Sequence, residues 1–314
     1  MVSAAVRNSN VTDRLASVRI AITGSSGLIG SALIRSLETD GHTVIRILRT
    51  QGGAGTLRWD IAAGHIDHEG LEDLDAVVHL AGEGIAERRW SDEQKRKILE
   101  SRTQGTALLA NALAALTHKP PVLLCGSAIG FYGNRGDEQL QETSARGSGF
   151  LAEVVVAWEA AAAPAEAAGI RTPRLRTGIV LDAHGGVLGR IGPLAKLGLL
   201  GKLGDGKQWM SWISLHDEVR AIRFLLEADV TGPVNLTAPT PVTNATFTKA
   251  VGSVLHRPTL LPIPRFGPKL LLGPELADAL LFEGQRVFPQ VLQEAGFPFD
   301  HPEIDGTLRS IFTR

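Results

Sequence analysis

The stretch VRIAITGSSGLIGSALIRSLETDGHTVIRILRT, residues 18–50, predicts a strand, a turn, a helix and a second strand. Val18–Thr23 is apolar and rich in β-branched residues, which favours a buried strand, and Leu28–Thr39 carries apolar residues at helical spacing. Gly41 ends the helix, and Thr43–Leu48 is the second apolar run. Two apolar strands joined through a helix are typical of the start of a parallel sheet.

The turn between this strand and helix has the pattern T-G-x-x-G-x-x-G at residues 23–30. Its glycines let the backbone approach a pyrophosphate, and the helix N-terminus adds free N–H groups and a partial positive charge. A merely structural turn is the alternative, because glycine is common in turns. In this strand–turn–helix context we expect cofactor binding by Gly24, Ser25, Ser26, Gly27, Leu28, Ile29 and Gly30.

The residue after the second strand indicates which dinucleotide binds. An acidic residue there would accept hydrogen bonds from an adenosine ribose 2′-OH, whereas an arginine suits a 2′-phosphate. This chain has Arg49 at that place and no acidic residue nearby, which predicts NADP(H), with a solvated surface arginine as the alternative. Asp60, at the end of the third expected strand, is placed to bind an adenine amino group or to cap a loop.

Strands continue to alternate with helices up to about residue 182. Further strands are expected at residues 56–60, 75–80, 121–126 and 170–181, and helices at residues 91–116 and 149–168. This alternation predicts an α/β Rossmann fold, a doubly wound parallel sheet with helices on both faces.

After residue 182 the pattern changes, and we expect a smaller C-terminal α+β substrate lobe over residues 183–314, with some chain crossing back to the core. Glycine and proline cluster over residues 185–206 with little alternation, and the proline-rich residues 258–268 are expected to be extended. Helices are expected at residues 215–227, 244–255 and 270–281. Residues 18–182 would form the NADP-binding domain, and residues 1–17 a flexible N-terminal extension.

Composition excludes several classes of function. The formal net charge of −1 argues against a nucleic-acid or anionic-membrane partner held by a broad basic field. Cys125 is the only cysteine, so no internal disulfide and no cysteine-based zinc site can form, and the histidines lack metal-ligand spacing. No apolar run is long enough to span a bilayer or to act as a secretory signal. We expect a cytoplasmic protein with a small-molecule substrate and no metal, and a transit peptide is the alternative for its first residues.

Several motifs together resemble a known superfamily. TGSSGLIG, HLAGE, GSAIGFYG and GDGKQWMSWISLHDEVRAI, in this order, are similar to the extended short-chain dehydrogenases/reductases. AGEGIAERRW, GPVNLTAPTPVTNATFTKAV and GQRVFPQVLQEAGF resemble an atypical epimerase-like branch of this NAD-dependent epimerase/dehydratase superfamily. The resemblance covers about residues 18–312 and implies a Rossmann core, a small substrate lobe and bound NADP. It brings no established substrate.

The resemblance also implies a Ser, Tyr and Lys set, with the last two spaced Y-x-x-x-K on one helix, and this chain departs from it. Tyr132 is the only tyrosine, and no lysine occurs between Lys119 and Lys196. Counting along the helix places the tyrosine position near Leu151 and the lysine position near Val155. The usual Tyr–Lys dyad is therefore absent from the sequence.

Three residues remain as catalytic candidates. The serine position falls on Ala128, and one shift in the loop would restore Ser127. Tyr132 matches the tyrosine of the family's Y-G turn, normally a pocket wall, and would act as a proton donor if it faced the nicotinamide. Glu83, after the cofactor-lining Leu80, Ala81 and Gly82, is either a replacement general base or a carboxylate that binds loop backbone.

Six further residues are candidates for substrate binding: Arg88, Arg89, Trp90, Lys207, Trp209 and Trp212. The arginines would bind a phosphate or carboxylate, and the tryptophans would stack on a sugar-like ligand. A solvated helix entrance and packing between lobes are the alternatives. His216 and Asp217 look like a catalytic pair, but the spacing of Ser214 and Asp217 favours a capped helix start.

Two classes of function fit these observations. The first is an NADP(H)-dependent oxidoreductase or epimerase-like enzyme on a small hydroxyl or carbonyl compound, which includes sugar nucleotides. The second is a catalytically silent NADP(H)-binding redox sensor or scaffold. The missing dyad favours the second, and the polar residues retained along the expected cleft favour the first.

Overall fold

A central eight-stranded sheet dominates the computed structural model, which describes residues 17–50, 52–259 and 261–313. The expected N-terminal extension, apart from Ser17, lies outside the described residues. The order of the strands across the sheet is β12-β8-β6-β5-β1-β2-β3-β4. All neighbours pair in parallel except β4, which runs antiparallel to β3. The strands are β1 (Arg19–Thr23), β2 (Thr43–Leu48), β3 (Thr56–Asp60), β4 (His65–Ile66), β5 (Ala76–His79), β6 (Leu123–Ala128), β8 (Pro173–Thr177) and β12 (Gly232–Leu236).

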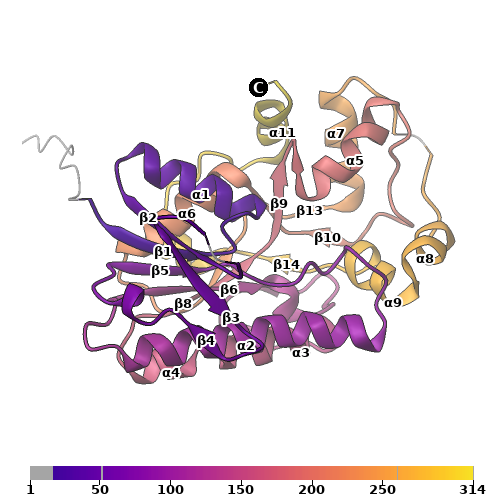
Figure 1. The fold of residues 1–314 in the computed structure, drawn as a ribbon. Helices are drawn as coiled ribbons and strands as arrows, with labels where there is room; N and C mark the ends of the chain where they lie inside the picture. The colour runs from indigo at the N-terminus through magenta and orange to yellow at the C-terminus, as the bar shows by residue number, and fades with distance from the viewer. Residues whose placement is uncertain (1–16, 51, 260, 314) are drawn as a thin grey trace, which may run out of the picture.

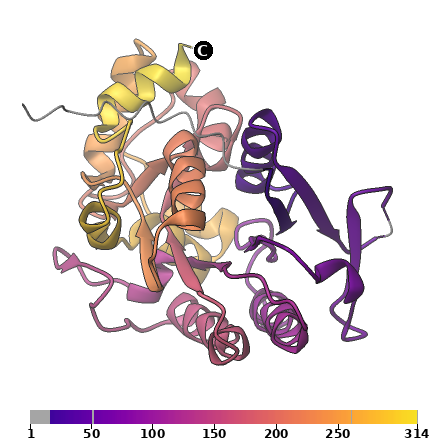
Figure 2. The ribbon, with the colours of Figure 1, turned by 90° about the vertical axis from the view of Figure 1, so that its left-hand side faces the viewer.

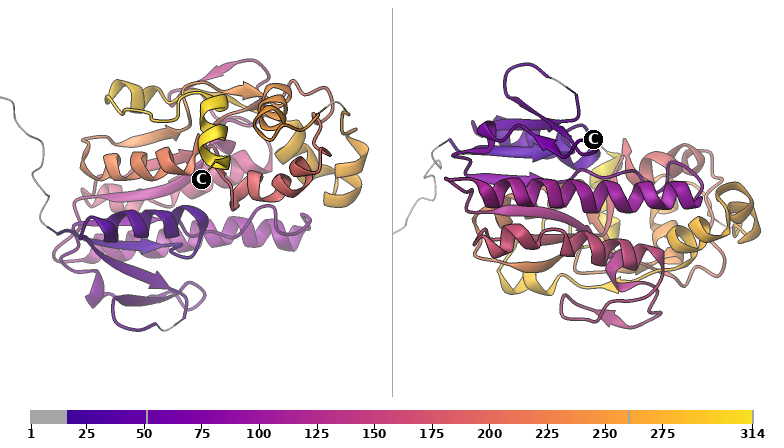
Figure 3. Two further views of the ribbon diagram at one scale, coloured as in Figure 1. Left: turned by 90° about the horizontal axis from the view of Figure 1, so that it is seen from above. Right: turned by 60° about the horizontal axis from the view of Figure 1, so that its bottom comes forward.

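Helices cover both faces of this sheet (Figure 1). The helices α1 (Leu28–Thr39) and α6 (Leu215–Glu227) lie together on one face. On the other face lie α2 (Asp92–Ala115), α3 (Phe150–Ala160) and α4 (Ala163–Ala167), with α2 and α3 side by side in the right-hand view of Figure 3. Figure 2 shows α1 and α2 on opposite sides of the strands.

The alternation of side chains along β1 explains the two layers. Ile20 and Ile22 point to the core under α1 and α6, whereas Ala21, between them, points to the core under α2. All three are buried, because successive residues of a strand face opposite sides and both sides are covered. The predicted apolar run is therefore explained by the position of β1, a central parallel strand that is buried on both faces.

The strand order reverses between β1 and β5, since β2 and β3 follow on one side and β6 and β8 on the other. Such a reversal places the carboxyl ends of the strands on either side of a crevice, where open α/β sheets bind their ligands. The predicted Rossmann fold is confirmed, and the glycine-rich turn lies at this crevice.

A smaller part, built mostly from residues after 178, contains mainly helices and two-stranded sheets, and one of its short strands comes from between β6 and β8. Its helices are α5 (Gly186–Lys196), α7 (Asn244–Val254), α8 (Phe266–Leu272), α9 (Pro274–Ala277) and α11 (Ile304–Phe312). The short strands are β7 (Gln139–Leu140), β9 (Ile179–Asp182), β10 (Trp209–Met210), β11 (Trp212–Ser214), β13 (Val242–Thr243) and β14 (Arg286–Val287). Three segments from this half of the chain pack on the central sheet instead: α6, β12 and α10 (Gln290–Glu294).

The structure differs from the sequence analysis at three places, one of which is the expected helix over residues 270–281, which Gly273 divides between α8 and α9. The glycine and proline residues of 185–206, with their little alternation, led to no expected helix there, but α5 forms and contains Pro193. Residues 170–181 were expected to contain one strand, but the chain forms β8 and β9 on either side of Gly178. A Cβ at Gly178 would lie 2.6 Å from the Ser211 carbonyl oxygen, so glycine permits the close approach that lets β9 pair with β11.

The longest helix of the described residues, α2, begins where the sequence predicts. Ser91 is its N-cap, and the Ser91 hydroxyl accepts a hydrogen bond from the Gln94 backbone N–H at 3.2 Å. The helix carries charged residues, including the ion pair between Lys97 and Glu93. No helix in the described part of the chain is long and apolar enough to cross a membrane.

Candidate functional site

The glycine-rich turn packs backbone against backbone at the carboxyl end of β1. Gly24 has φ +67°, and a Cβ there would lie 2.7 Å from the Leu80 carbonyl carbon. A Cβ at Gly30 would lie 2.3 Å from the Gly24 carbonyl oxygen. Gly27 is the N-cap of α1 and offers no side-chain cap, so the first N–H groups of the helix have no intrahelical acceptor. The turn therefore presents free donors and the positive end of a helix, which is the chemistry of an anion site.

One buried hydroxyl joins this turn to the loop that follows β5. The Thr23 Oγ1 atom accepts hydrogen bonds from the backbone N–H groups of Leu80 at 3.0 Å and Ala81 at 3.2 Å. Its own proton is then donated to His79 Nδ1 at 2.7 Å, so the imidazole carries its proton on Nε2 and donates it to Thr106 Oγ1 at 2.9 Å. Burial lowers the pKa of His79 to about 4, which keeps the ring neutral.

The predicted cofactor-binding residues of the two loops therefore lie side by side. Leu80 and Ala81 are half-buried against the glycine turn, and Gly82 is exposed at the end of the segment. His79 and Thr106 were not predicted to contribute, because a histidine in an apolar strand gives no signal beyond core packing. Their role is to hold the backbone of residues 80–82 in place.

The two residues predicted to bind the adenosine half differ in their surroundings. Arg49 directly follows β2 and is exposed, with no hydrogen-bond or ion-pair partner among the residues that the structure describes. The neighbouring Arg46, by contrast, pairs with Glu38 at 3.3 Å. The Asp60 carboxylate accepts a hydrogen bond from the Ala63 backbone N–H at 3.1 Å, so the loop-capping alternative describes its position.

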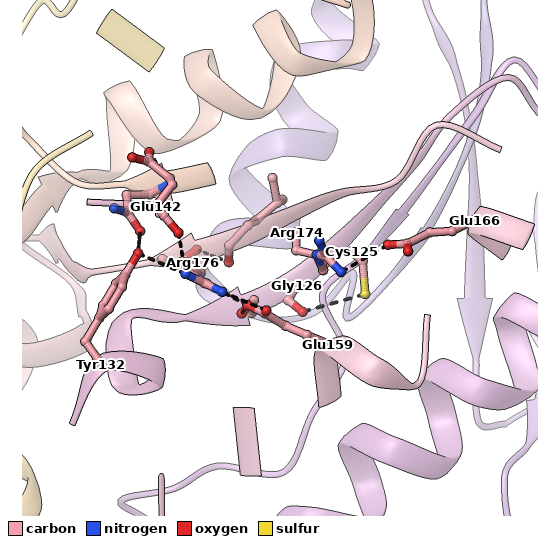
Figure 4. A network of polar contacts seen from close by, with 12 residues as sticks. Cys125, Gly126, Tyr132, Glu142, Glu159, Glu166, Arg174 and Arg176 are labelled. Carbon is pink, nitrogen blue, oxygen red and sulfur yellow. Dashed lines mark hydrogen bonds and ion pairs between the residues drawn. The ribbon is translucent and has the colours of Figure 1, made fainter. Parts of the chain in front are cut away.

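The hydroxyl groups of Tyr132 and Ser127 lie inside a buried network rather than at an open edge (Figure 4). The Tyr132 hydroxyl donates to Asn235 Oδ1 at 2.7 Å and accepts from Arg176 Nη1 at 3.0 Å. The Ser127 hydroxyl donates to Glu159 Oε1 at 2.6 Å. Desolvation by burial raises the pKa of Tyr132. The packing of β6 and its following turn thus directs both side chains inward, so the condition set for Tyr132 as a proton donor, that it face the nicotinamide, is not met in this structure.

The charge at the centre of this network is a buried ion pair between β8 and α3. Arg176 donates from Nε and Nη2 to the two carboxylate oxygens of Glu159, at 2.7 and 2.9 Å. Its guanidinium also lies 3.4 Å from the centre of the Phe131 ring. Arg176 and Glu159 were not predicted. The two arginines of the short strand PRLRT, Arg174 and Arg176, were the available signal.

The helix positions expected for the Tyr–Lys dyad face the turn after β6. A Cβ atom placed on Gly130, in this turn, would lie 3.4 Å from Leu151 Cβ and 3.8 Å from Val155 Cγ2. Both of these side chains are apolar and lie on α3. This edge of the crevice therefore presents no group that can exchange a proton at these two positions.

Glu83 follows the segment 80–82 and stands at the start of a longer loop. Its backbone N–H donates to Ser101 Oγ at 3.1 Å, and its carbonyl accepts from Arg102 Nη1 at 2.9 Å. The half-buried carboxylate has one long contact, 3.5 Å from Gln94 Nε2 to Oε1. Among the three catalytic candidates, Glu83 is the one whose reacting group is not held by a charged partner or buried in the network.

The loop after Glu83 is fastened by two of the predicted substrate residues. Arg89 donates from Nε to the Leu271 carbonyl at 2.9 Å and from Nη2 to the Leu270 carbonyl at the end of α8. Trp90 donates from Nε1 to the Ile85 carbonyl at 2.9 Å. Arg89 and Trp90 are therefore occupied by the protein itself, which corrects the expectation for them, whereas Arg88 is exposed.

The predicted substrate residues of the glycine-rich segment, Lys207, Trp209 and Trp212, also lie in different surroundings. Trp212 is fully buried in the core of the smaller part and donates from Nε1 to the Thr240 carbonyl at 3.1 Å, so it cannot contact a substrate in this structure. Trp209 is half-buried, with its Nε1 2.7 Å from Asp137 Oδ1 and its ring under Arg286. Lys207 is exposed. The alternative interpretation, packing between segments of the protein, therefore accounts for the positions of Trp212 and Trp209.

The segment around His216 and Asp217 starts a helix, as the spacing of Ser214 and Asp217 predicts. The Ser214 hydroxyl accepts a hydrogen bond from the Asp217 backbone N–H at 3.0 Å at the start of α6. The ligand atoms of His216, Asp217 and Asp300 lie within 4.8 Å of one another. Arg220 Nη1 already contacts both carboxylates at 3.0 Å, so this cluster holds a guanidinium where a metal ion would lie.

Comparison with known proteins settles the family. The sequence pattern of the NAD dependent epimerase/dehydratase family matches residues 20–237, and that of a domain of unknown function, DUF1731, matches residues 263–311. The chain belongs to the NAD dependent epimerase/dehydratase family. An epimerase family protein of Mycobacterium tuberculosis, MT2273, is 45% identical over 302 residues, which are 96% of this chain and 99% of the relative.

Solved structures place the chain within an epimerase-like branch of this family. The crystal structure of human epimerase family protein SDR39U1 with NADPH aligns with a TM-score of 0.86 at 32% identity, over 94% of this chain and 99% of the human chain. A nucleoside-diphosphate sugar epimerase from Corynebacterium glutamicum aligns with a TM-score of 0.78 at 36% identity, over 94% of this chain and 58% of that chain. The resemblance predicted from the motifs is confirmed.

Proposed function

We propose that the protein is an NADP(H)-dependent oxidoreductase or epimerase-like enzyme that acts on a small hydroxyl or carbonyl compound, a class that includes sugar nucleotides. The observation that carries this proposal is the exposed, unpartnered Arg49 beyond the uncapped N-terminus of α1. The NADPH in the related human SDR39U1 structure supports the same choice of cofactor.

The residues present fit the cofactor. Gly24 and Gly30 let the turn pack closely against residues 80–81 and against itself. The first N–H groups of α1 would then bind the pyrophosphate, and Arg49 would pair with the 2′-phosphate. The segment 80–82 lies beyond β1 on the side away from Arg49, and so supports the nicotinamide half. When bound, the cofactor supplies or accepts the hydride.

Within this site Glu83 is the group that we propose handles the proton. It follows the segment 80–82, and its carboxylate is half-buried with a single long contact. A carboxylate there takes the proton of a substrate hydroxyl during oxidation and returns it to the carbonyl oxygen during reduction. The buried positions of the Tyr132 and Ser127 hydroxyls favour Glu83 over both.

The choice of cofactor predicts a selective loss in Arg49→Ala. A charge-assisted contact with a phosphate contributes about 1.5–3 kcal/mol, so NADPH affinity should fall by about 10- to 150-fold. NADH affinity should change little, because NADH lacks the 2′-phosphate. Fluorescence titrations with both cofactors measure this, and an equal loss for the two would show that Arg49 does not read the 2′-phosphate.

The position of the pyrophosphate predicts different results for two glycines. A Cβ at Gly27 meets only the Gly24 carbonyl oxygen, at 3.3 Å, so the Gly27→Ala variant should fold. Its NADPH affinity should fall, because the added methyl group faces the phosphates. Gly30→Ala places its Cβ 2.3 Å from the same oxygen and should lower the free energy of unfolding by about 1–3 kcal/mol. Urea unfolding and calorimetric titration separate the two effects. Unchanged NADPH affinity in Gly27→Ala would contradict the proposed position.

Activity is tested by NADPH oxidation with a panel of carbonyl compounds and sugar nucleotides. With any substrate found, Glu83→Gln should lower turnover by about 10²- to 10⁴-fold, the usual contribution of a general acid or base. NADPH affinity should stay within about threefold, because the backbone of residue 83 keeps its contacts with Ser101 and Arg102. Wild-type turnover in this variant would remove Glu83 from the mechanism.

One observation favours a second function, a silent NADP(H)-binding sensor or scaffold. The hydroxyl groups of Tyr132 and Ser127 are committed to the network around Arg176, and Leu151 and Val155 are apolar. A protein that bound NADPH tightly and oxidised it with no compound of the panel would favour this second function.

A further inference from the structure

Arg102 of α2 lies directly behind Gly82, at the end of the segment that follows β5. The position that a Cβ of residue 82 would occupy is 3.3 Å from Arg102 Cζ and 3.4 Å from Nη2. Because residue 82 is an exposed glycine, no side chain covers this edge of the guanidinium. The arginine therefore borders the site at the point where the proposed nicotinamide half and Glu83 meet.

Most of the hydrogen-bond donors of this guanidinium are unused. Nη1 donates to the carbonyl oxygens of Glu83 at 2.9 Å and Ile98 at 3.2 Å. The Trp158 ring centre lies 5.1 Å from Cζ and supports the group from one side. Nε and Nη2 have no acceptor in the described ranges of the chain, so three of the five N–H groups of a guanidinium remain free.

The charge of Arg102 also lacks a direct ion pair within the part of the chain that the structure describes, and the carboxylate that attracts it is that of Glu83. No carboxylate of the described residues lies within ion-pair distance, and the nearby Glu83 carboxylate contacts Gln94 instead. Burial lowers the pKa of Arg102 to about 10 even though the negative charge of Glu83 opposes this shift, so the charged form is poorly solvated. Arg176, the other buried arginine at this end of the sheet, has both oxygens of Glu159 as partners. A half-buried guanidinium without a carboxylate is a receptor for an external anion.

The strand order excludes one part of the cofactor as this anion. The 2′-phosphate belongs beyond β2, and β1 separates β2 from β5, the strand before Gly82. The pyrophosphate belongs at the N-terminus of α1. An anion at Gly82 lies instead beside Glu83, where the substrate is held for proton transfer.

We propose that Arg102 binds an acidic group of the substrate, a carboxylate or a phosphate, through Nε and Nη2. This inference rests on the proposed function and narrows its substrate class to small anionic hydroxyl or carbonyl compounds, including nucleotide sugars bound through phosphate. It makes Arg102 a substrate-binding residue as well as a support for the Glu83 backbone.

The test compares Arg102→Met with Arg96→Met, an exposed arginine of the same helix. Calorimetry measures NADPH affinity first, and then the binding of oxalate and of inorganic phosphate to the protein saturated with NADP⁺. At least one anion should bind the wild-type complex, and Arg102→Met should weaken it by about tenfold or more while NADPH affinity stays within about threefold. Arg96→Met should match the wild type. The stronger of the two anions distinguishes a carboxylate from a phosphate substrate.

A second variant guards against misfolding. Arg102→Gln keeps a donor for the Glu83 carbonyl and removes the charge, so it should lose anion affinity to the same degree. Anion affinity unchanged in both variants, no anion binding to the wild-type complex, or an equal loss of NADPH affinity would each overturn the proposal. If the wild type fails to bind NADPH, the proposed function is wrong, and the same comparison on the free protein then decides the role of Arg102.

Discussion

Arg176→Met is expected to lower the free energy of unfolding by about 3–5 kcal/mol, the usual cost of leaving one member of a buried ion pair alone. The Arg176 and Glu159 side chains are 4% and 9% exposed, so water cannot replace the lost guanidinium. The Tyr132 hydroxyl also loses a donor. Urea unfolding at pH 7 measures the loss.

The matched control removes the other charge as well. The double variant Arg176→Met, Glu159→Leu leaves no unpaired charge and should recover a large part of the lost free energy, because a buried ion pair contributes little over apolar residues of similar volume. A double variant as unstable as the single one would show that shape, and not charge, determines the cost.

Glu218→Gln is expected to stabilise the protein at pH 8 by about 3–5 kcal/mol. The Glu218 carboxyl is fully buried and accepts one hydrogen bond from Thr177 Oγ1 at 2.9 Å, and its Oε2 atom has no partner among residues 17–50, 52–259 and 261–313. Burial raises the pKa of Glu218 from 4.5 to about 8. The folded protein therefore keeps this group protonated at neutral pH, whereas the unfolded chain ionises it.

The sign of the effect follows from these two pKa values. The stability that the protonated carboxyl contributes is fully present below pH 4.5 and is lost as the pH rises to about 8. The difference in free energy of unfolding between Glu218→Gln and the wild type should grow over this range and then level off. Glu227→Gln, an exposed position of the same helix, should show no such growth. A constant difference from pH 5 to pH 9 would contradict a raised pKa.

Those elements whose signals are local could be predicted from the sequence. The bounds of β2, β3 and α1 match the expectation because apolar spacing and glycine stops decide them. The strand β12 gave no comparable signal, since GPVNL is short and begins with glycine and proline. Its place in the sheet comes from pairing with β8, where Val234 lies opposite Leu175. Such pairing between distant segments is invisible to periodicity.

In the candidate site, too, the residues with local signals could be predicted and those that depend on distant segments could not. The glycine turn and the segment 80–82 follow from neighbouring residues, and the structure brings them together. The surroundings of Tyr132 depend on Asn235 and Arg176, which come from strands far along the chain, so its burial could not be predicted. Arg102 lies in a polar stretch of α2 and looks like any solvated helix residue until the position of Gly82 is known.

The loop between Glu83 and α2 joins the central sheet to the helices of the smaller part. Arg190 of α5 donates to the Ala86 carbonyl at 3.2 Å, and Arg89 grips the end of α8. Lys95, just beyond the loop, pairs with Glu275 of α9. Three helices of the smaller part are thus tethered to one short segment, with Glu83 at its root. The Glu83 backbone is itself held from the other side by Ser101 and Arg102 of α2. A substitution in this segment should therefore change the packing of the three helices and the position of Glu83 together.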